Sequence, residues 1–230
     1  MQNSDRDSHA ASTGLWCKLI AGAPVRKTRF HDQLGRRIGL GRALRNGPRA
    51  LVTGIGRLAL GLRPKSPWIS YDAQAVIAGI LRPSSRVLEF GSGMSTIWFA
   101  QRAGHVVSIE DDRTWYEAVR DRLPAGKVEY RFASGCDEYL AAVPNDKFDL
   151  IMIDGHWRDQ CARFAVEHLA AGGSIYLDNS DNSCDPVTGD MPAAVRLLTE
   201  FANSRAMRIR EFTDFAPTQL FVQRGLLIGG

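Results

Sequence analysis

The sequence predicts an α/β fold in which a seven-stranded, mostly parallel sheet carries helices on both faces. From about Arg86 onward, short runs rich in β-branched residues alternate with amphipathic runs, which is typical of consecutive β–α units. Near the end of the chain, two more β-type runs are joined by Ala216 and Pro217, which predicts an antiparallel hairpin at the sheet edge. Five β–α units and a terminal hairpin account for the seven strands.

Each expected element follows from the period of its apolar residues. A helix is expected at 67–80, and one or two short helices are expected at 30–62, where glycines should weaken any continuous helix. The expected strands are 86–90, 105–109, 127–132, 148–153 and 173–178, followed by the hairpin segments MRIREFTDF and TQLFVQR. The expected helices between the strands are 94–102, 114–122, 136–142, 159–171 and 192–203.

The composition favours one domain of catalytic size with an appendage, since 44% of the 230 residues are hydrophobic and 23% are charged. No apolar run reaches the about 18 residues of a membrane span, and acids stand where a signal peptide needs a basic start. The four cysteines lack CxxC pairing and regular spacing, which argues against a zinc site or a disulfide framework. A soluble, cytoplasmic protein is therefore expected. The cysteines are Cys17, Cys136, Cys161 and Cys184.

Positive charge is concentrated upstream of the expected sheet. Residues 18–65 contain twelve Lys and Arg against one Asp, whereas residues 66–230 have a net charge of −6. We therefore divide the chain into a basic leader at 1–65, partly helical or disordered, and a main domain at 66–230. Such a leader can be merely solvated, or it can contact an anionic membrane surface peripherally through residues 18–65. Aromatic residues are nearly absent from its basic part, so no specific nucleic acid is expected as a partner.

A glycine-containing turn follows the first expected strand and leads into a helix. In such a turn, backbone N–H groups and the helix N-terminus can face a ligand. Gly91 suits a tight turn, Gly93 leaves room for a ligand near the backbone, and Ser95 or Thr96 can cap the helix. The alternative is an ordinary turn that uses glycine for its geometry alone. The candidate ligand loop is Glu89-Phe90-Gly91-Ser92-Gly93.

An acid follows the second expected strand, nineteen residues after Gly91. This residue, Glu110, can accept hydrogen bonds from both hydroxyls of a ribose. The alternative is a solvated acid in the run SIEDD. The third glycine of a dinucleotide-binding pattern is missing, because Thr96 occupies its place. The acid Glu89, just before the glycines, also suits a cationic ligand better than a diphosphate.

The pattern ExGxGxST, followed by an acid at the next strand end, resembles the first two motifs of class I S-adenosylmethionine-dependent methyltransferases. The resemblance implies a Rossmann-like fold and S-adenosylmethionine as cofactor, bound by the loop from Glu89 to Thr96 with its ribose on Glu110. It also implies an adenine contact after the third strand, where Asp137 can accept from the adenine amino group and Cys136 can pack on the ring. Either residue can equally cap a helix.

Polar residues follow the fourth and fifth expected strands, in the segments DGHWRD and YLDNSDN. If these strands are neighbours, their ends lie about 5 Å apart, and the side chains of Asp154, Asp178 and Asn179 converge. Two carboxylates and an amide carbonyl are hard oxygen ligands, which suit Mg2+ or Ca2+. The alternatives are that Asp154 contacts the cofactor or the acceptor, and that Asp178 and Asn179 only cap a turn.

This arrangement resembles the metal-dependent catechol and caffeoyl-coenzyme A O-methyltransferases, and DGHWRD is similar to the DHWKD-type segment of the catechol enzymes. The sequence departs from that segment by an additional Gly155 and by Arg158 in place of a lysine. Because arginine stays charged, the lysine base of that family is not secured, and His156 becomes the alternative base. The candidate catalytic residues are Asp154, His156 and Arg158.

The resemblance implies methyl transfer from S-adenosylmethionine to a small or carrier-linked acceptor, by attack of an oxygen, with metal assistance if the triad forms. Two alternatives are metal-independent transfer to nitrogen and a non-catalytic S-adenosylmethionine-binding module docked through the basic leader. The polar loop at 179–190 and the segment 67–80 are candidate lids, the second through Trp68 and Tyr71. The sequence specifies neither the acceptor nor an oligomeric state.

Overall fold

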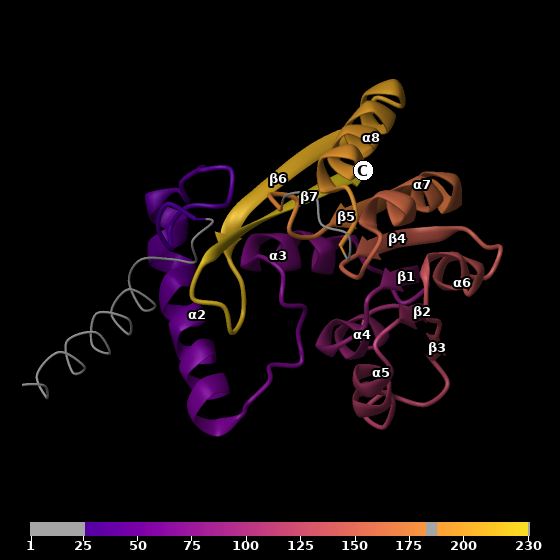
Figure 1. Cartoon of the computed structure of the whole chain (residues 1–230), viewed down its shortest axis with the longest axis horizontal. Coiled ribbons are helices and arrows are strands. Elements are labelled where there is room, and N and C mark those ends of the chain that lie inside the picture. The colour runs from indigo at the N-terminus through magenta and orange to yellow at the C-terminus, as the bar shows by residue number, and fades with distance from the viewer. Residues whose placement is uncertain (1–25, 183–187, 230) are drawn as a thin grey trace, which may run out of the picture.

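The computed structural model describes residues 26–182 and 188–229 and contains one seven-stranded sheet of order β3-β2-β1-β4-β5-β7-β6 (Figure 1). Strands β1 to β5 are parallel, and β7 runs antiparallel to both β5 and β6. The α/β fold with a terminal antiparallel hairpin is thereby confirmed. The strands are β1 (Arg86–Phe90), β2 (His105–Glu110), β3 (Val128–Phe132), β4 (Phe148–Ile153), β5 (Leu169–Leu177), β6 (Arg208–Phe215) and β7 (Val222–Gly229).

Helices cover both faces of the sheet. On one face, α6, α7 and α8 pack over strand residues such as Phe90 and Ile153; on the other, α3 and α4 pack over residues such as Val87 and Met152. The alternation follows from the period of two in a strand, which sends neighbouring side chains to opposite faces. The helices are α2 (Leu40–Leu60), α3 (Tyr71–Ile80), α4 (Met94–Ala100), α5 (Arg113–Arg120), α6 (Cys136–Ala141), α7 (Arg158–His168) and α8 (Met191–Ser204).

The carboxyl ends of the four central parallel strands are level with one another. Phe90 is paired with both Ile109 and Ile153, and Ile153 is paired with Leu177. The residues that follow these four therefore lie side by side at one edge of the sheet. Strand β1 has β2 on one side and β4 on the other, so the strand order reverses direction between β1 and β4. Open sheets bind ligands at such a switch point. The residues in question are Gly91, Glu110, Asp154 and Asp178.

The expectation of one or two short helices at 30–62 is wrong, because α2 is one continuous helix of 21 residues. Two of its glycines are used for packing: an added Cβ on Gly54 would lie 3.0 Å from Leu220, and one on Gly47 would lie 3.6 Å from Phe215. These small residues let α2 approach the β6–β7 hairpin closely, and that contact outweighs their poor helix propensity. Figure 1 shows α2 beside the far end of this hairpin.

The segment before α2 is also attached to the sheet, at β7 and just after β5. Arg26 donates to the Val222 carbonyl at 3.1 Å, and the Gln33 N–H donates to the Asp181 carboxylate at 2.8 Å. The boundary at residue 65 stays a prediction, and Cys17 and Cys184 lie outside the described residues. Within the described ranges, no helix is long and apolar enough to cross a membrane.

Candidate active site

Two glycines let the chain cross tightly where β1 and β4 end. Gly91 has a φ of +89°, and an added Cβ would lie 2.7 Å from the backbone nitrogen of Gly155. An added Cβ on Gly155 would in turn lie 2.4 Å from the Tyr139 hydroxyl. No side chain fits at either position. The additional Gly155, which separates this sequence from the DHWKD-type segment, therefore allows the loop after β4 to pass against the loop after β1.

The glycine loop is held by Glu110, the acid at the end of β2. One carboxylate oxygen accepts from the Ser92 N–H at 3.0 Å and from the Ser92 hydroxyl at 2.5 Å. The other accepts from the N–H groups of Asp111 and Asp112. The Ser92 hydroxyl also lies 2.7 Å from the Tyr130 hydroxyl, so it has a second partner within reach. Glu110 thus joins the loop after β1 to the end of β2, and its predicted ribose contact stays a prediction.

Glu89 lies under the same loop and is fully buried. Its Oε2 accepts from the Thr96 hydroxyl at 2.6 Å and from the Ser108 hydroxyl at 2.7 Å. Its Oε1 is buried and has no hydrogen-bond partner within the described part of the chain. Burial raises the pKa of Glu89 to about 7, and the nearby Asp154 adds to this effect. Glu89 is therefore a carboxyl group that can gain or lose a proton near neutral pH.

A small pocket opens beside this loop and the end of β4. Its volume is about 70 Å³, and Trp115 fixes one wall by donating from its indole N–H to the Ser92 carbonyl at 2.8 Å. Trp68, from the segment before α3, lies on the pocket as well, and its own indole nitrogen has no partner within residues 26–182 and 188–229. The lining residues are Ser66, Trp68, Ser92, Gly93, Met94, Ser95, Trp115 and Asp154.

The carboxyl groups of Asp154 and Asp178 lie near each other at the ends of β4 and β5, as predicted, close enough for each to influence the pKa of the other. Burial raises the pKa of both, and for Asp178 the charge of Asp154 raises it further. Arg158 lies between the two strand ends and is only 5% exposed. Its guanidinium donates to the carbonyls of Gly155, Asp154 and Asp178, and to the Asp154 carboxylate at 3.2 Å.

This arrangement does not fit the predicted Mg2+ or Ca2+ site of Asp154, Asp178 and Asn179. The Arg158 guanidinium already supplies positive charge to the two carboxyl groups, and a divalent cation beside it would be repelled. Asp178 is 3% exposed and accepts from the Tyr176 hydroxyl at 3.2 Å. Among the residues with described positions, no group of three or more His, Cys, Asp or Glu could hold a metal ion. The sequence could not indicate the position of Arg158, because Arg158 contacts the Asp178 carbonyl, 20 residues away in the chain.

His156 is oriented by an acid that the sequence had not singled out. Its Nδ1 pairs with the carboxylate of Asp111, the residue directly after Glu110. The His156 ring therefore lies over the end of β2, and the next residue, Trp157, packs edge-on against Tyr139 at 5.3 Å. The two partners are 45 residues apart, so no local pattern could have indicated the pair.

Three further predicted cofactor residues lie outside the pocket. Phe90 is fully buried and packs against Tyr139 and Phe164 in the core. Thr96 is buried beneath the loop, where it accepts from the Gly93 N–H at 3.0 Å. Asp137 is exposed in the first turn of α6, so its adenine contact stays a prediction. Phe90 and Thr96 thus support the glycine loop from the core side and do not line the pocket.

Known structures share this architecture, although no protein-family model and no curated protein matches the sequence. A putative O-methyltransferase from Klebsiella pneumoniae is 21% identical over 96% of both chains, with a TM-score of 0.53. TomG, an O-methyltransferase of tomaymycin synthesis from Streptomyces achromogenes in complex with S-adenosylmethionine, is 15% identical over 99% of both chains, with a TM-score of 0.55. A Bacillus cereus O-methyltransferase in complex with S-adenosylhomocysteine is 18% identical over 80% of this chain and 91% of that chain, with a TM-score of 0.54. The chain therefore has the Rossmann-like fold of class I methyltransferases.

Proposed function

We propose that this protein transfers the methyl group of S-adenosylmethionine to an oxygen of a small or carrier-linked acceptor. One observation carries the proposal: the glycine loop at the switch point has one acid beneath it, Glu89, and is held by a second, Glu110. A sulfonium cofactor combines a ribose, which needs acceptors, with a positive charge, which needs carboxylates. The fold, which known O-methyltransferases share, supports the same interpretation.

The proposed cofactor pose follows the order of groups along the strand ends. The ribose hydroxyls donate to Glu110, while the Ser92 hydroxyl turns to Tyr130. The methionine end enters the pocket lined by Gly93 and Asp154. His156, which Asp111 orients beside Glu110, then borders the nucleoside half of the cofactor. Asp154 is the better candidate to face the acceptor, because it lies both in the pocket and next to Asp178.

In the proposed reaction, the acceptor oxygen attacks the methyl carbon in line with the sulfur. The new O–C bond forms as the C–S bond breaks, and the sulfonium becomes the neutral thioether of S-adenosylhomocysteine. The acceptor's hydroxyl proton passes to Asp154, whose raised pKa makes it a stronger base than an exposed carboxylate. The chain's contribution is to hold donor and acceptor at attack distance and to exclude water. No step requires a metal ion.

The proposal is tested by calorimetry and by transfer of labelled methyl groups to a panel of hydroxyl acceptors. In wild type, S-adenosylhomocysteine should bind, and transfer to oxygen should be unaffected by a chelator. Glu110→Ala should weaken binding by at least about tenfold, because hydrogen bonds to a charged acceptor contribute roughly 1.5 to 3 kcal/mol each. The affinity of Glu110→Asp should lie between those of wild type and Glu110→Ala. Gly93→Val should fold, since the φ of Gly93 is 166°, but place branched carbons at the pocket.

Three outcomes would contradict this proposal. Wild-type affinity in both a folded Gly93→Val variant and Glu110→Ala would reject the cofactor site. Binding of S-adenosylmethionine without transfer to any acceptor would instead indicate a non-catalytic binding module. Labelled product found on nitrogen alone would retain the cofactor site but reject the oxygen acceptor.

A further inference from the structure

The outward face of α2 is an apolar surface that no element of residues 26–182 and 188–229 covers. Within the described chain, the large hydrophobic side chains that are exposed all lie between Phe30 and Leu62. Five of them recur along α2 at spacings of four, seven, four and three residues, which places them within one narrow strip of a helix with 3.6 residues per turn. We call these five the α2 stripe: Leu40, Leu44, Leu51, Ile55 and Leu58.

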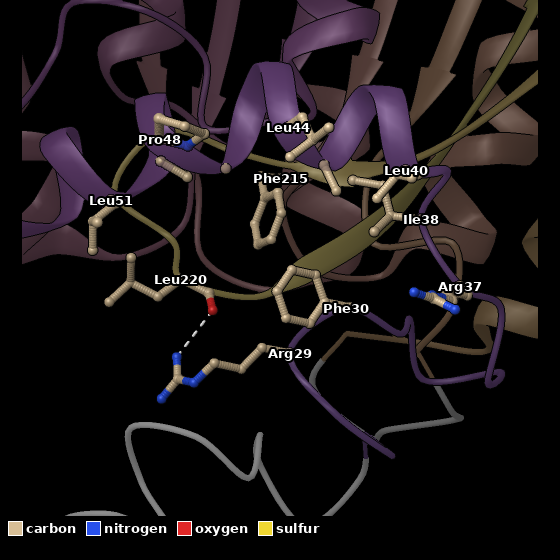
Figure 2. Close-up of a pocket in the computed structure, with 13 residues that line it drawn as sticks. Arg29, Phe30, Arg37, Ile38, Leu40, Leu44, Pro48, Leu51, Phe215 and Leu220 are labelled. Atoms are coloured by element: carbon tan, nitrogen blue, oxygen red, sulfur yellow. Dashed lines mark hydrogen bonds between the residues drawn. The ribbon is translucent and has the colours of Figure 1, made fainter.

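The α2 stripe continues into an apolar groove of about 600 Å³ between α2 and the β6–β7 hairpin. Figure 2 shows Phe30 and Phe215 facing each other in this groove, with Leu220 beyond them. At its rim, Arg29 donates to the Leu220 carbonyl at 2.9 Å, and the exposed Arg37 lies at the other end. The stripe and the groove thus form one apolar surface with cations at its border.

The charges around this surface have one sign. Residues 33–71 contain eight Lys and Arg and no Asp or Glu. Asp72 at the start of α3 pairs with Arg42 and Arg45, on the flank of α2 that faces the protein. Three exposed cations in this stretch lie over the rings of Tyr71, Trp68 and Trp115. Counting these three, five exposed cations have no carboxylate partner among the described residues, so the stretch carries uncompensated positive charge. They are Arg37, Arg49, Arg57, Arg63 and Lys65.

We propose that the α2 stripe docks this protein on an anionic membrane surface. A helix with an apolar strip and basic flanks lies in the plane of the interface, with its apolar face inserted and its cations near lipid phosphates. Leu40 and Leu58, the two ends of the stripe, are 18 positions apart, or about 27 Å at 1.5 Å per residue, which suits a helix lying flat. A second copy of the chain is a poorer occupant, because an acid-free surface pairing with itself brings like charges together.

The test is co-sedimentation of the full-length protein with vesicles of phosphatidylcholine alone and of phosphatidylcholine with phosphatidylglycerol. Wild type should bind the anionic vesicles and bind neutral ones weakly, and salt should reduce the binding. Leu51→Glu/Ile55→Glu should lower affinity for anionic vesicles by at least about tenfold, since it removes two inserted side chains and adds repulsion. Both residues are exposed, so the fold should be retained.

A matched variant separates apolar insertion from net charge. Ala78→Glu/Ala118→Glu adds the same two charges at exposed positions on α3 and α5, away from the α2 stripe, and should bind nearly as wild type does. Leu44→Ser/Leu58→Ser removes two members of the stripe without a charge change and should also lose binding. Circular dichroism confirms that each variant is folded.

The proposal is overturned if wild type fails to bind anionic vesicles, or if the stripe variants and the matched variant lose binding equally. It is also overturned if sedimentation velocity shows a wild-type dimer that the stripe variants dissociate while vesicle binding is absent. In that case the stripe is an interface between two copies. None of these results depends on the cofactor site, so methyl transfer is tested independently.

Discussion

Glu89 and Glu110 are buried carboxyl groups on neighbouring strands, yet they differ in the number and type of their hydrogen-bond donors. Glu110 accepts four hydrogen bonds, three of them from backbone N–H groups, and both of its oxygens have partners. Glu89 accepts two hydrogen bonds from hydroxyls and leaves one oxygen without a partner, so burial dominates and raises its pKa to about 7. A cation bound near Glu89 would favour its charged form.

This difference predicts how the pH dependence of stability changes in Glu89→Gln. The folded pKa of about 7 lies above the unfolded value of 4.5, so the folded state keeps the proton longer. The stability from Glu89 is therefore complete below pH 4.5 and is lost as pH rises to about 7. The loss amounts to about 3 kcal/mol at most, from 1.36 kcal/mol per pKa unit.

Because the amide of Glu89→Gln does not titrate, the free energy of unfolding should fall less in the variant than in wild type between pH 5 and pH 8. Urea unfolding at a series of pH values measures this. The other buried acids, such as Asp178 and Asp214, titrate in both proteins, so their contributions cancel in the comparison. Parallel curves for the two proteins would show that Glu89 keeps an ordinary pKa.

At the scale of single elements, a helix or strand could be predicted where the contacts that determine its ends lie nearby in the sequence. Strands β1 and β4 begin and end at the predicted residues, because their apolar runs are bounded by turn residues. By contrast, β5 begins at Leu169, inside the expected helix 159–171, because Leu169 pairs with Phe148. The continuous α2 depends likewise on Leu220, far away in the chain.

The same distinction between local and distant contacts applies to the candidate site. The glycine loop and Glu110 were predictable, because the turn chemistry and the spacing along one β–α–β unit are properties of the sequence itself. The pairing of His156 with Asp111 and the position of Arg158 between two strand ends were not, since each requires the folded sheet. The metal prediction is unsupported for the same reason: the ligand types are present, but the Arg158 guanidinium lies among them.

Arg158 joins the ends of β4 and β5, so its removal should act on these elements and not through a metal. Arg158→Ala leaves the Asp154 and Asp178 pair without its buried cation, which should lower the free energy of unfolding by about 3 to 5 kcal/mol. Melting temperatures of wild type should be the same with Mg2+, with Ca2+ and with a chelator. A metal-dependent rise in wild type that Asp178→Asn abolishes would contradict this and restore the oxygen-ligand site.

At the scale of the whole molecule, α2 and the candidate site are connected through the chain between them. After α2 ends at Leu60, the chain passes through Arg63 and reaches Ser66 and Trp68, which line the pocket. The Arg57 guanidinium of α2 stacks on Trp68, 4.7 Å from its ring centroid, and the Arg63 guanidinium lies 5.2 Å from the centroid of Trp115. The wall of the pocket is therefore attached to the helix that we expect at the membrane.

The pocket is so small that we expect its wall to move before the cofactor can enter. About 70 Å³ is far below the roughly 300 to 1,000 Å³ of typical ligand sites, so we expect the wall to move when the methionine end of the cofactor enters. Trp68 is the large side chain on the connecting segment, whereas Trp115 is fixed by its hydrogen bond to Ser92. Opening at Trp68 should therefore limit both entry and exit of the cofactor.

Trp68→Ala should consequently raise both the association and the dissociation rate constants of S-adenosylhomocysteine by about tenfold, with a smaller change in Kd, because the barrier is lowered from both sides. Stopped-flow fluorescence, with Trp115 as the reporter, measures both constants. Trp98→Phe is the control, since Trp98 packs in the core under α4 and does not line the pocket. If Trp68→Ala changed Kd through the dissociation rate alone, Trp68 would be a cofactor contact and the opening would lie elsewhere.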